Sequence, residues 1–345
     1  MDNHVSVQDK VVMVTGAGGS IGYVLAQHIA RAQPERLILA DSSELNLYEI
    51  GCTLDEMGVG CPMENLILDV RDHQTLRSVF VKHDPAIVFH AAALKHVPLL
   101  ENEHNLVEAV RTNVLGSKNV ADLCSAHGAS MVMVSTDKAV NPSSVMGLTK
   151  RVAEIYVHAK ALRHPQSSFL QVRFGNVMGS SGSVIPKFKR QIAAGGPVTV
   201  THPDMTRYMM SINDAVQLVL SAADMHGVGS GFGLYILDMG KPVKIVDLAC
   251  QLIELAGLRP YADIPIEFTG IRPGEKLNET LTYEWEALSQ TATHGVLSAS
   301  PDFPPLAKGK MIEALLHHAA VHDGPEVKGL LQQIVPEFTG ADVWA

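Results

Sequence analysis

The chain of 345 residues is 46% hydrophobic and 18% charged, and its formal net charge is -9. A chain of this length and composition buries a full-sized core, which excludes an intrinsically disordered protein. The acidic balance offers no basic surface to a polyanion, so nucleic acid is excluded as a partner, although local basic residues can still bind a phosphorylated small molecule.

The N-terminal residues, Met1 to Lys10, are polar and lack the pattern of a signal peptide. No segment of the sequence is apolar for long enough to cross a bilayer, and we therefore predict a cytoplasmic protein. Cys52, Cys61, Cys124 and Cys250 form no CxxC motif, which favours reduced thiols over a metal site or a disulfide framework.

Short apolar runs rich in valine, isoleucine and leucine recur in the first half of the chain, with amphipathic stretches between them. These runs are Val11 to Val14, Leu37 to Leu39, Leu66 to Leu68, Ala86 to Phe89 and Met131 to Val134. Alternating strands and helices predict a parallel sheet, whose strands are continuously apolar because both of its faces are buried. The predicted fold class is α/β, with a Rossmann-like doubly wound parallel sheet.

After Phe174 the sequence changes to loops rich in glycine, serine and proline, mixed with short strands and with helices such as Ile212 to Ala223 and Ile245 to Ala256. This composition predicts a smaller C-terminal substrate-binding lobe. We expect a nucleotide-binding Rossmann domain over residues 1–175 and the lobe over residues 176–345, with the lobe partly interleaved with the first domain.

A glycine-rich segment, Thr15-Gly16-Ala17-Gly18-Gly19-Ser20-Ile21-Gly22, directly follows the first predicted strand and opens a helical pattern. In this position Gly16 permits a tight turn, and Gly19 lets the backbone approach a pyrophosphate at the helix N-terminus. Gly22 allows the helix to pack closely on the strand. The placement between strand and helix favours a dinucleotide site over an ordinary turn.

Acidic residues follow the second and third predicted strands. Asp41 is placed to accept hydrogen bonds from the adenosine ribose and to repel a 2′-phosphate, which predicts NAD rather than NADP. The alternative role for Asp41, the N-cap of the next helix, fits Ser42 or Ser43 better. Asp69, with Val70, is placed to meet the adenine, although a simple turn aspartate explains this position nearly as well.

A second candidate segment, Ser135-Thr136-Asp137-Lys138, ends the fifth predicted strand, and ligands bind at such strand ends in open parallel sheets. Met146 and Lys150 follow, one helical turn apart. Short-chain dehydrogenases have a serine and then Tyr-x-x-x-Lys on a helix, so a methionine occupies the tyrosine position. Charged residues after a strand are often only a solvated pair, but the spacing of Ser135 and Lys150 and the missing tyrosine favour catalysis by Asp137 and Lys138.

Seven segments carry a specific likeness: Thr15 to Gly22, His90 to Pro98, Ser135 to Pro142, Met146 to Arg151, Arg173 to Val177, Thr201 to Tyr208 and Arg272 to Lys276. Together they cover most of the chain and resemble the polysaccharide-biosynthesis UDP-N-acetylglucosamine 4,6-dehydratases, which are extended short-chain dehydrogenases. Many members of that family carry an N-terminal membrane-spanning region and a second Rossmann domain. We therefore expect a short soluble form or the catalytic part of a longer parent.

The resemblance implies that the sugar is oxidised at C4 by NAD, loses water across C5 and C6, and receives the hydride back at C6. It makes Asp137 the acid that protonates the leaving hydroxyl and Lys138 the base that removes the C5 proton. Thr136 would orient the sugar hydroxyls, and Lys150 would bind the nicotinamide ribose. A thioether transfers no proton, so Met146 is expected to pack around the nicotinamide.

The resemblance also implies the binding residues. Beside the glycines, the acidic residues and Lys150 named above, the expected NAD contacts are Ser20, Ile21, Ala91 and Ala92. The expected nucleotide-sugar contacts are Lys95, His96, Asn176, Val184, Lys187, Val198, Thr199, Arg207, Arg272 and Glu275. Arg207 and Arg272 are the expected phosphate ligands, although a single arginine is more often a partner in a surface ion pair. Asn113 is expected to be scaffold.

These features predict a UDP-N-acetylglucosamine 4,6-dehydratase, with retention at C5 favoured, that acts in surface polysaccharide or glycan biosynthesis. Its substrate would be UDP-N-acetylglucosamine or a related UDP-HexNAc. One alternative is an NAD-dependent sugar-nucleotide 4-epimerase, which normally keeps the tyrosine and needs no acid–base pair. Another is a non-catalytic NAD-binding sensor, against which Lys150 and the Thr-Asp-Lys run argue. We expect no metal and a homo-oligomer.

Overall fold

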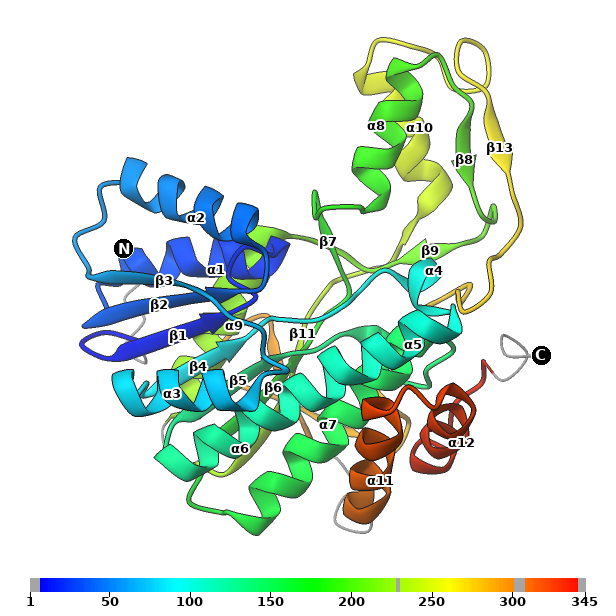
Figure 1. Ribbon diagram of the computed structural model, residues 1–345. Helices are drawn as coiled ribbons and strands as arrows, with labels where there is room; N and C mark the ends of the chain where they lie inside the picture. Colours follow the sequence, from blue (N-terminus) through cyan, green and yellow to red (C-terminus); the bar gives the residue numbers. More distant parts are fainter. Residues whose placement is uncertain (1–6, 228–229, 301–307, 341–345) are drawn as a thin grey trace.

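A nine-stranded sheet organises the residues that the computed structural model describes, which are 7–227, 230–300 and 308–340 (Figure 1). The strand order is β14-β15-β11-β6-β5-β4-β1-β2-β3. The strands are β1 (Val11–Thr15), β2 (Arg36–Asp41), β3 (Met63–Ile67), β4 (Ile87–His90), β5 (Ser130–Val134), β6 (Phe169–Arg173), β11 (Phe232–Leu237), β14 (Ala287–Gln290) and β15 (Val296–Ser300). The strands from β3 to β11 pair in parallel, whereas β15 and β14 pair antiparallel. The predicted doubly wound fold is confirmed.

The five predicted strands correspond to β1 to β5. In β2 and β4 the apolar side chains are buried on both faces of the sheet, as their continuously apolar sequences predicted. The strand β3 differs, because it is the edge strand and has a neighbour on one side only. It carries Glu64 and Asn65, and Ile67 is 65% exposed. The part of the polar N-terminus that precedes residue 7 lies outside the described residues.

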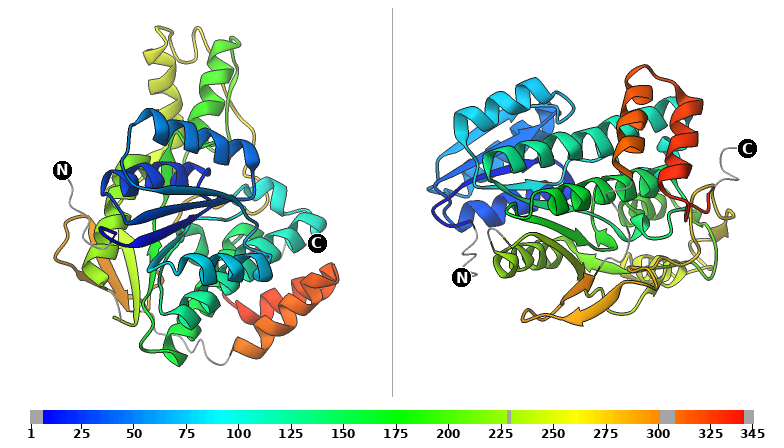
Figure 2. Two further views of the ribbon diagram at one scale, coloured as in Figure 1. Left: turned by 60° about the vertical axis from the view of Figure 1, so that its left-hand side comes forward. Right: turned by 90° about the horizontal axis from the view of Figure 1, so that it is seen from below.

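Helices cover both faces of this sheet (Figure 2). One face is packed by the helices of one core cluster, which are α1 (Ser20–Arg31), α2 (Glu44–Glu56) and α9 (Ile212–His226). The other face is packed by α3 (His73–His83), α6 (Ser117–His127) and α7 (Val145–Arg163). Strand order reverses between β1 and β4, so a crevice is expected at the carboxyl ends of these strands.

Short helical segments extend the second face. They are α4 (Val97–Leu100), α5 (Glu103–Ala109), a π-helix η1 (Val110–Gly116) and a 3₁₀ turn η2 (Asp137–Ala139). The C-terminal helices α11 (Gly309–Ala320) and α12 (Gly324–Ile334) pack against η1, α5 and α7 through a separate apolar cluster. In Figure 1 these two helices lie beside α5 and α7 at the lower right.

A lobe projects from the sheet at the upper right of Figure 1. Its own apolar core joins α8 (Val184–Ala193), β8 (Val198–Val200), α10 (Ile245–Leu255) and β13 (Ile266–Phe268). The pairs β7 (Asn176–Met178) with β10 (Met209–Ser211), and β9 (Thr206–Arg207) with β12 (Val243–Lys244), lie at its base. Because α9, β11, β14 and β15 return to the central sheet, the chain after residue 175 builds both the lobe and part of the sheet.

Candidate active site

Three cavities lie along the carboxyl ends of the parallel strands. The β2 cavity, of about 390 Å³, adjoins Gly16, Asp41 and the segment that follows β3. The central cavity, of about 430 Å³, lies over β1, β4 and β5 and shares Gly19 with the β2 cavity. The lobe cavity, of about 290 Å³, opens between the sheet and the lobe and shares Lys138 and Asn176 with the central cavity. The three spaces therefore form one continuous path.

The glycine turn after β1 holds the junction of the first two cavities. Gly16 has a φ of +68°, and a Cβ atom there would lie 2.6 Å from the backbone nitrogen of Ala92. A Cβ atom on Gly22 would lie 2.0 Å from the backbone oxygen of Gly16. Gly19 is the N-cap of α1 and carries no side chain that could cap the helix, so the first amide groups of α1 are left to a ligand or water. This loop fits a dinucleotide pyrophosphate.

Asp41 lines the β2 cavity and also holds the turn. Its Oδ2 atom accepts a hydrogen bond from the Gly18 amide, and its Oδ1 atom accepts one from the Ser43 amide, both at 2.9 Å. Each carboxylate oxygen retains a further acceptor site, so Asp41 can still receive ribose hydroxyls. Ser43, not Asp41, is the N-cap of α2, because its hydroxyl accepts a hydrogen bond from the Asn46 amide.

Asp69 and Val70 also line the β2 cavity, together with Ala91 and Ala92. The Asp69 carboxylate is bound to the Arg71 guanidinium. Burial acts to raise the pKa of Asp69, but the hydrogen bonds from Arg71 outweigh burial and lower it. Asp69 therefore reaches this cavity as an ionised carboxylate that is already paired.

The central cavity is lined by Ser20, Ile21 and most of the predicted catalytic group. Ser135, Thr136, Lys138, Met146 and Lys150 all contribute to its wall. Lys150 donates a hydrogen bond of 2.7 Å to the Val134 carbonyl. Burial lowers the pKa of Lys150 to about 8, against a smaller raising effect of the Glu154 carboxylate.

The Asp137 and Lys138 side chains form a close pair. The Asp137 Oδ1 atom accepts hydrogen bonds from the Thr136 hydroxyl at 2.9 Å and from the Lys138 ammonium at 3.0 Å. Lys138 also donates to Asn176 Oδ1 at 3.1 Å. Asp137 is fully buried and lines neither the central nor the lobe cavity, so the alternative of a solvated loop pair is wrong for this residue. Thr136 and Lys138, which donate hydrogen bonds to its carboxylate, line the central cavity.

The Ser135 hydroxyl is engaged in a buried ionic network that the sequence analysis missed. It donates a hydrogen bond of 2.7 Å to Glu154, whose carboxylate also receives two hydrogen bonds from Arg173. Arg173, fully buried, donates its remaining hydrogen bonds to Glu286. Ser135 therefore holds the end of β5 in place, and the Thr136 hydroxyl is the one that contacts Asp137. No local pattern reveals this network, because Glu286 lies far along the chain.

Asn113, expected to be scaffold, lies in the π-helix η1. Its amide oxygen accepts from the Leu94 amide at 2.8 Å, and its amide nitrogen donates to the Leu94 carbonyl and to Thr149. It thus ties the loop after β4 to α7. That loop presents Lys95 and His96 to both the central and the lobe cavities. Burial lowers the pKa of each of these two side chains.

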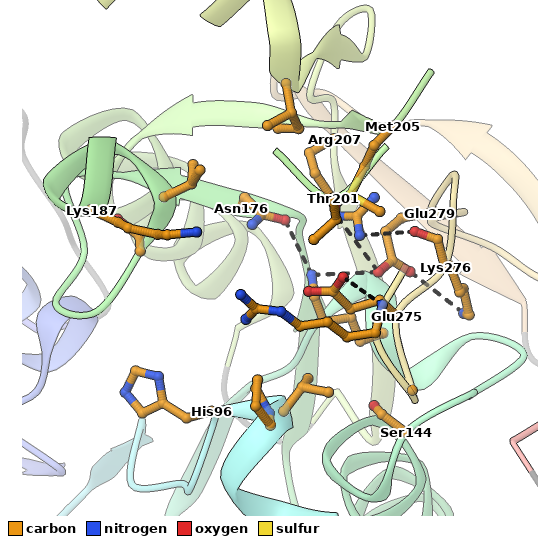
Figure 3. Close-up of a pocket in the computed structure, with 18 of the residues that line it drawn as sticks. His96, Ser144, Asn176, Lys187, Thr201, Met205, Arg207, Glu275, Lys276 and Glu279 are labelled. Atoms are coloured by element: carbon orange, nitrogen blue, oxygen red, sulfur yellow. Dashed lines mark hydrogen bonds and ion pairs between the residues drawn. The ribbon is translucent and has the colours of Figure 1, made fainter. Parts of the chain in front are cut away.

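Most of the predicted nucleotide-sugar contacts line the lobe cavity (Figure 3). These are Lys95, His96, Asn176, Val184, Lys187, Thr199, Arg207, Arg272 and Glu275. Figure 3 shows Lys187 and Arg207 on opposite sides of the space. Arg207 donates hydrogen bonds to the carbonyls of Thr206, Lys276 and Leu277, so its guanidinium is already partly used.

Val198 does not reach the lobe cavity. Its side chain is fully buried in the lobe core with Phe188 and Ile253, whereas Thr199, the next residue of β8, faces the cavity. The sequence analysis also missed Lys276 and Glu279, two charged residues of the same wall.

The remaining negative predictions concern the described residues only. Residues 7–227, 230–300 and 308–340 contain no group of three potential metal ligands. In the same part of the chain, no helix combines the length and the apolar character needed to cross a bilayer. The four cysteines are free thiols.

Comparison with known proteins adds to this geometry. The capsular polysaccharide biosynthesis protein CapD of Staphylococcus aureus is 50% identical over 79% of this chain and 45% of its own length. A UDP-N-acetylglucosamine 4,6-dehydratase (inverting) of Campylobacter jejuni is 35% identical over 80% of this chain and 81% of its own length. A UDP-glucose 4-epimerase of Rickettsia typhi is 38% identical over 79% and 77%, respectively.

The fold has a counterpart among solved structures. The X-ray structure of Pen from Bacillus thuringiensis superposes with a TM-score of 0.72 at 32% identity, and it covers 80% of this chain and 84% of that chain. The chain spans about half the length of the first curated relatives it matches. A family model described as polysaccharide biosynthesis protein matches residues 12–301. With the glycine turn, the Thr-Asp-Lys segment and the lobe cavity in one continuous site, this match shows that the chain belongs to the polysaccharide biosynthesis protein family.

Proposed function

We propose that the chain catalyses the NAD-dependent 4,6-dehydration of UDP-N-acetylglucosamine or a related UDP-HexNAc. The single observation that carries the proposal is the ion pair between buried Asp137 and Lys138, because Lys138 lines both the central and the lobe cavities. An epimerase needs no such acid–base pair. The dehydratase from Campylobacter jejuni, which is similar over most of both chains, supports this reaction.

The cofactor would occupy the β2 and central cavities. Gly19 and the N-terminus of α1 would meet its pyrophosphate, Asp41 its adenosine ribose and Lys150 its nicotinamide ribose. Bound NAD would supply the capacity to take a hydride from sugar C4 and to return it to C6. Titration of the protein with NAD and NADP tests Asp41: we expect tighter binding of NAD, and tighter binding of NADP would refute this role.

The protein side chains would perform the proton transfers. Lys138 lines both cavities and would remove the proton at C5. Asp137 would take up the proton of the C4 hydroxyl during the oxidation and then deliver it to the departing C6 hydroxyl. The Thr136 hydroxyl, which donates to Asp137, would orient the sugar hydroxyls. Arg207 and Arg272 line the lobe cavity and would bind the pyrophosphate of the sugar nucleotide, with Lys187 as a further cation. Met146 carries no transferable proton.

A 4-epimerase is the second candidate, because the relatives in Rickettsia carry that name. Incubating purified protein with UDP-N-acetylglucosamine and NAD separates the two reactions. We expect a product that is lighter by one water, and a product of unchanged mass would instead establish epimerisation.

We further propose retention of configuration at C5, because the methionine form resembles the retaining branch of the family, although the Campylobacter relative is named inverting. Product NMR reads this configuration directly. A homo-oligomer and a cytoplasmic location stay predictions.

A further inference from the structure

Glu279 is a buried acidic residue in the wall of the lobe cavity, and the proposed reaction gives it no role. Its side chain is 4% exposed. Three cationic groups surround its carboxylate: the Lys138 ammonium at 3.9 Å, the Lys276 ammonium at 3.5 Å and the Arg207 guanidinium at 4.0 Å. Figure 3 shows Glu279 directed toward Arg207 and Lys276 across this wall.

The Glu279 carboxylate lacks the contacts of an ordinary structural residue. Within the described part of the chain its Oε2 atom is buried and makes no hydrogen bond. A buried carboxylate of purely structural use is normally satisfied by donors at hydrogen-bond distance. The Glu279 carboxylate oxygens instead lie 3.5 to 4.0 Å from three cationic groups, which is the arrangement of a shared counter-ion.

The segment that carries Glu279 is fixed to the catalytic segment. Lys276 donates a hydrogen bond of 2.7 Å to the Val140 carbonyl, and the Tyr283 hydroxyl donates one of 3.0 Å to the Ala139 carbonyl. Ser143 donates to the Gly274 carbonyl at 2.9 Å. These contacts leave Glu279 little freedom to move away from Lys138.

The local charges show what Glu279 contributes. The cluster contains three cations, Lys138, Lys276 and Arg207, and two anions, Asp137 and Glu279. Further charged or titratable groups line the same cavity, namely Lys95, His96, Lys187, Arg272 and Glu275. Without the Glu279 charge, Asp137 would be the remaining anion in contact with the Lys138 ammonium.

We propose that Glu279 is a positioning residue that stabilises the protonated form of Lys138 and holds its ammonium at the cavity junction. This inference rests on the proposed function for its catalytic meaning. The proton that leaves C5 would bond to Lys138 Nζ, and Glu279 stabilises the ammonium formed. The ammonium hydrogens exchange with solvent, and Nζ then returns one proton to C5, which leaves the amine as it began.

The first test measures Lys138 itself and needs no substrate. Trace labelling of the full chain with acetic anhydride, followed by peptide mass spectrometry, reports the fraction of each lysine in the free amine form. Exposed Lys82 serves as the internal reference. In Glu279→Gln, the labelling of Lys138 at neutral pH should rise about threefold to tenfold, because the ammonium loses a counter-ion. Glu279→Asp should give a smaller rise.

A matched control is Glu284→Gln, which removes an exposed carboxylate from the same segment. It should leave Lys138 labelling unchanged. If Glu279→Gln also labels like the parent, Lys138 is not coupled to Glu279 and the inference is overturned. This holds whatever reaction the protein catalyses, so failure of the dehydratase proposal remains distinguishable.

The second test follows exchange of the sugar H5 with solvent deuterium as a function of pH. In Glu279→Gln the H5 exchange rate at the plateau of the pH profile should fall about tenfold, because Lys138 becomes a weaker base. The acidic limb of the profile should move to lower pH, because the Lys138 ammonium has lost a counter-ion. The KM for UDP-N-acetylglucosamine should stay within about threefold of the parent value. A raised KM with an unchanged exchange profile would reduce Glu279 to a substrate-binding residue and overturn the inference.

Discussion

Met146 is expected to serve packing in this site and to take no part in proton transfer. Met146 is 5% exposed and packs in the apolar cluster with Leu148 and Val152, while it also lines the central cavity. A thioether fills irregular space but carries no transferable proton. We therefore expect Met146→Ala to keep turnover per folded molecule within about threefold of the parent, because proton transfer belongs to other residues.

The loss of a buried methionine side chain costs about 2–5 kcal/mol of stability, so the fraction of folded protein must be measured beside the rate. Met146→Leu, which conserves volume, provides the control with the smaller cost. An almost complete loss of turnover in folded Met146→Ala with NAD binding intact would contradict a packing role.

Asp137 and Lys138 should fail at different stages. Lys138→Ala should block exchange of H5 with solvent deuterium and let some reduced nicotinamide accumulate, because its defect follows the oxidation at C4. Asp137→Asn should stop water loss and also slow the oxidation, since the amide can no longer take up the proton of the C4 hydroxyl. Each defect should be about 100-fold to 10,000-fold in rate.

Both variants should still bind the UDP-sugar and NAD, which calorimetry verifies. Stopped-flow absorbance of reduced nicotinamide and the NMR signal of H5 distinguish the two stages. Near-parental turnover in both variants would remove the acid–base pair on which the dehydratase proposal depends.

Among the secondary-structure elements, those set by local sequence could be predicted. Gly16 and Ser43 occupy the turn and the N-cap that their neighbours indicated, because these conformations depend on a few adjacent residues. The burial of Val198 in the lobe core depends on packing against Phe188 and Ile253, which the three residues of β8 do not encode. The π-helix around Asn113 has no sequence pattern of its own; its contacts with Leu94 and Thr149 come from other elements.

The ion network between β6 and α7 is another element that local sequence could not reveal. Arg173 extends from β6 to Glu154 of α7 and to Glu286, and all three side chains are buried. Removing one partner of such a network leaves the other buried charges without a counter-charge. We expect Arg173→Met to lower the free energy of unfolding by about 3–5 kcal/mol.

The double variant Arg173→Met/Glu286→Gln should cost less than the sum of its single variants, because the second change removes a stranded charge. Urea unfolding of the four proteins measures this coupling. Arg259→Met is the matched control, since Arg259 pairs with Asp263 at the surface and is 79% exposed, and it should change little. Additive effects would show that the Arg173–Glu286 pair contributes no net coupling.

For the whole molecule, the sequence predicted the parallel sheet and the path of the cofactor, because glycines and strand ends follow one another along the chain. It did not predict that residues near the C-terminus support the catalytic segment. The Tyr283 hydroxyl donates to the Ala139 carbonyl and lies 3.2 Å from a Glu337 carboxylate oxygen, and Arg151 stacks over its ring. The Tyr283 contacts with Ala139 and Arg151 join residues more than a hundred positions apart, and no local period encodes them.

Acid should destabilise the whole molecule through histidines that fold in the neutral form. The His90 ring lies between β1 and the start of α6, where Ser117 donates its proton to the Asn113 carbonyl and therefore accepts from His90 Nε2. The Nδ1 atom is then the acceptor for the Thr15 hydroxyl. Burial, with a smaller effect of the Lys150 charge, lowers the pKa of His90 to about 3. Burial likewise lowers the pKa of His158 to about 4.

A folded-state pKa below the unfolded value means that His90 contributes stability above pH 6.5 and loses it as the pH falls toward 3. Between pH 6.5 and 5 this loss is about 2 kcal/mol, and His158 adds to it. Glu101 acts in the opposite direction, because burial raises its pKa to about 6, but it offsets only about 1 kcal/mol over this range.

Urea unfolding at pH 6.5 and 5 should therefore show a net loss of unfolding free energy in the parent. His90→Asn should make that loss smaller by about 2 kcal/mol, whereas exposed His73→Asn should leave it unchanged. An undiminished loss in His90→Asn would mean that His90 does not fold in the neutral form.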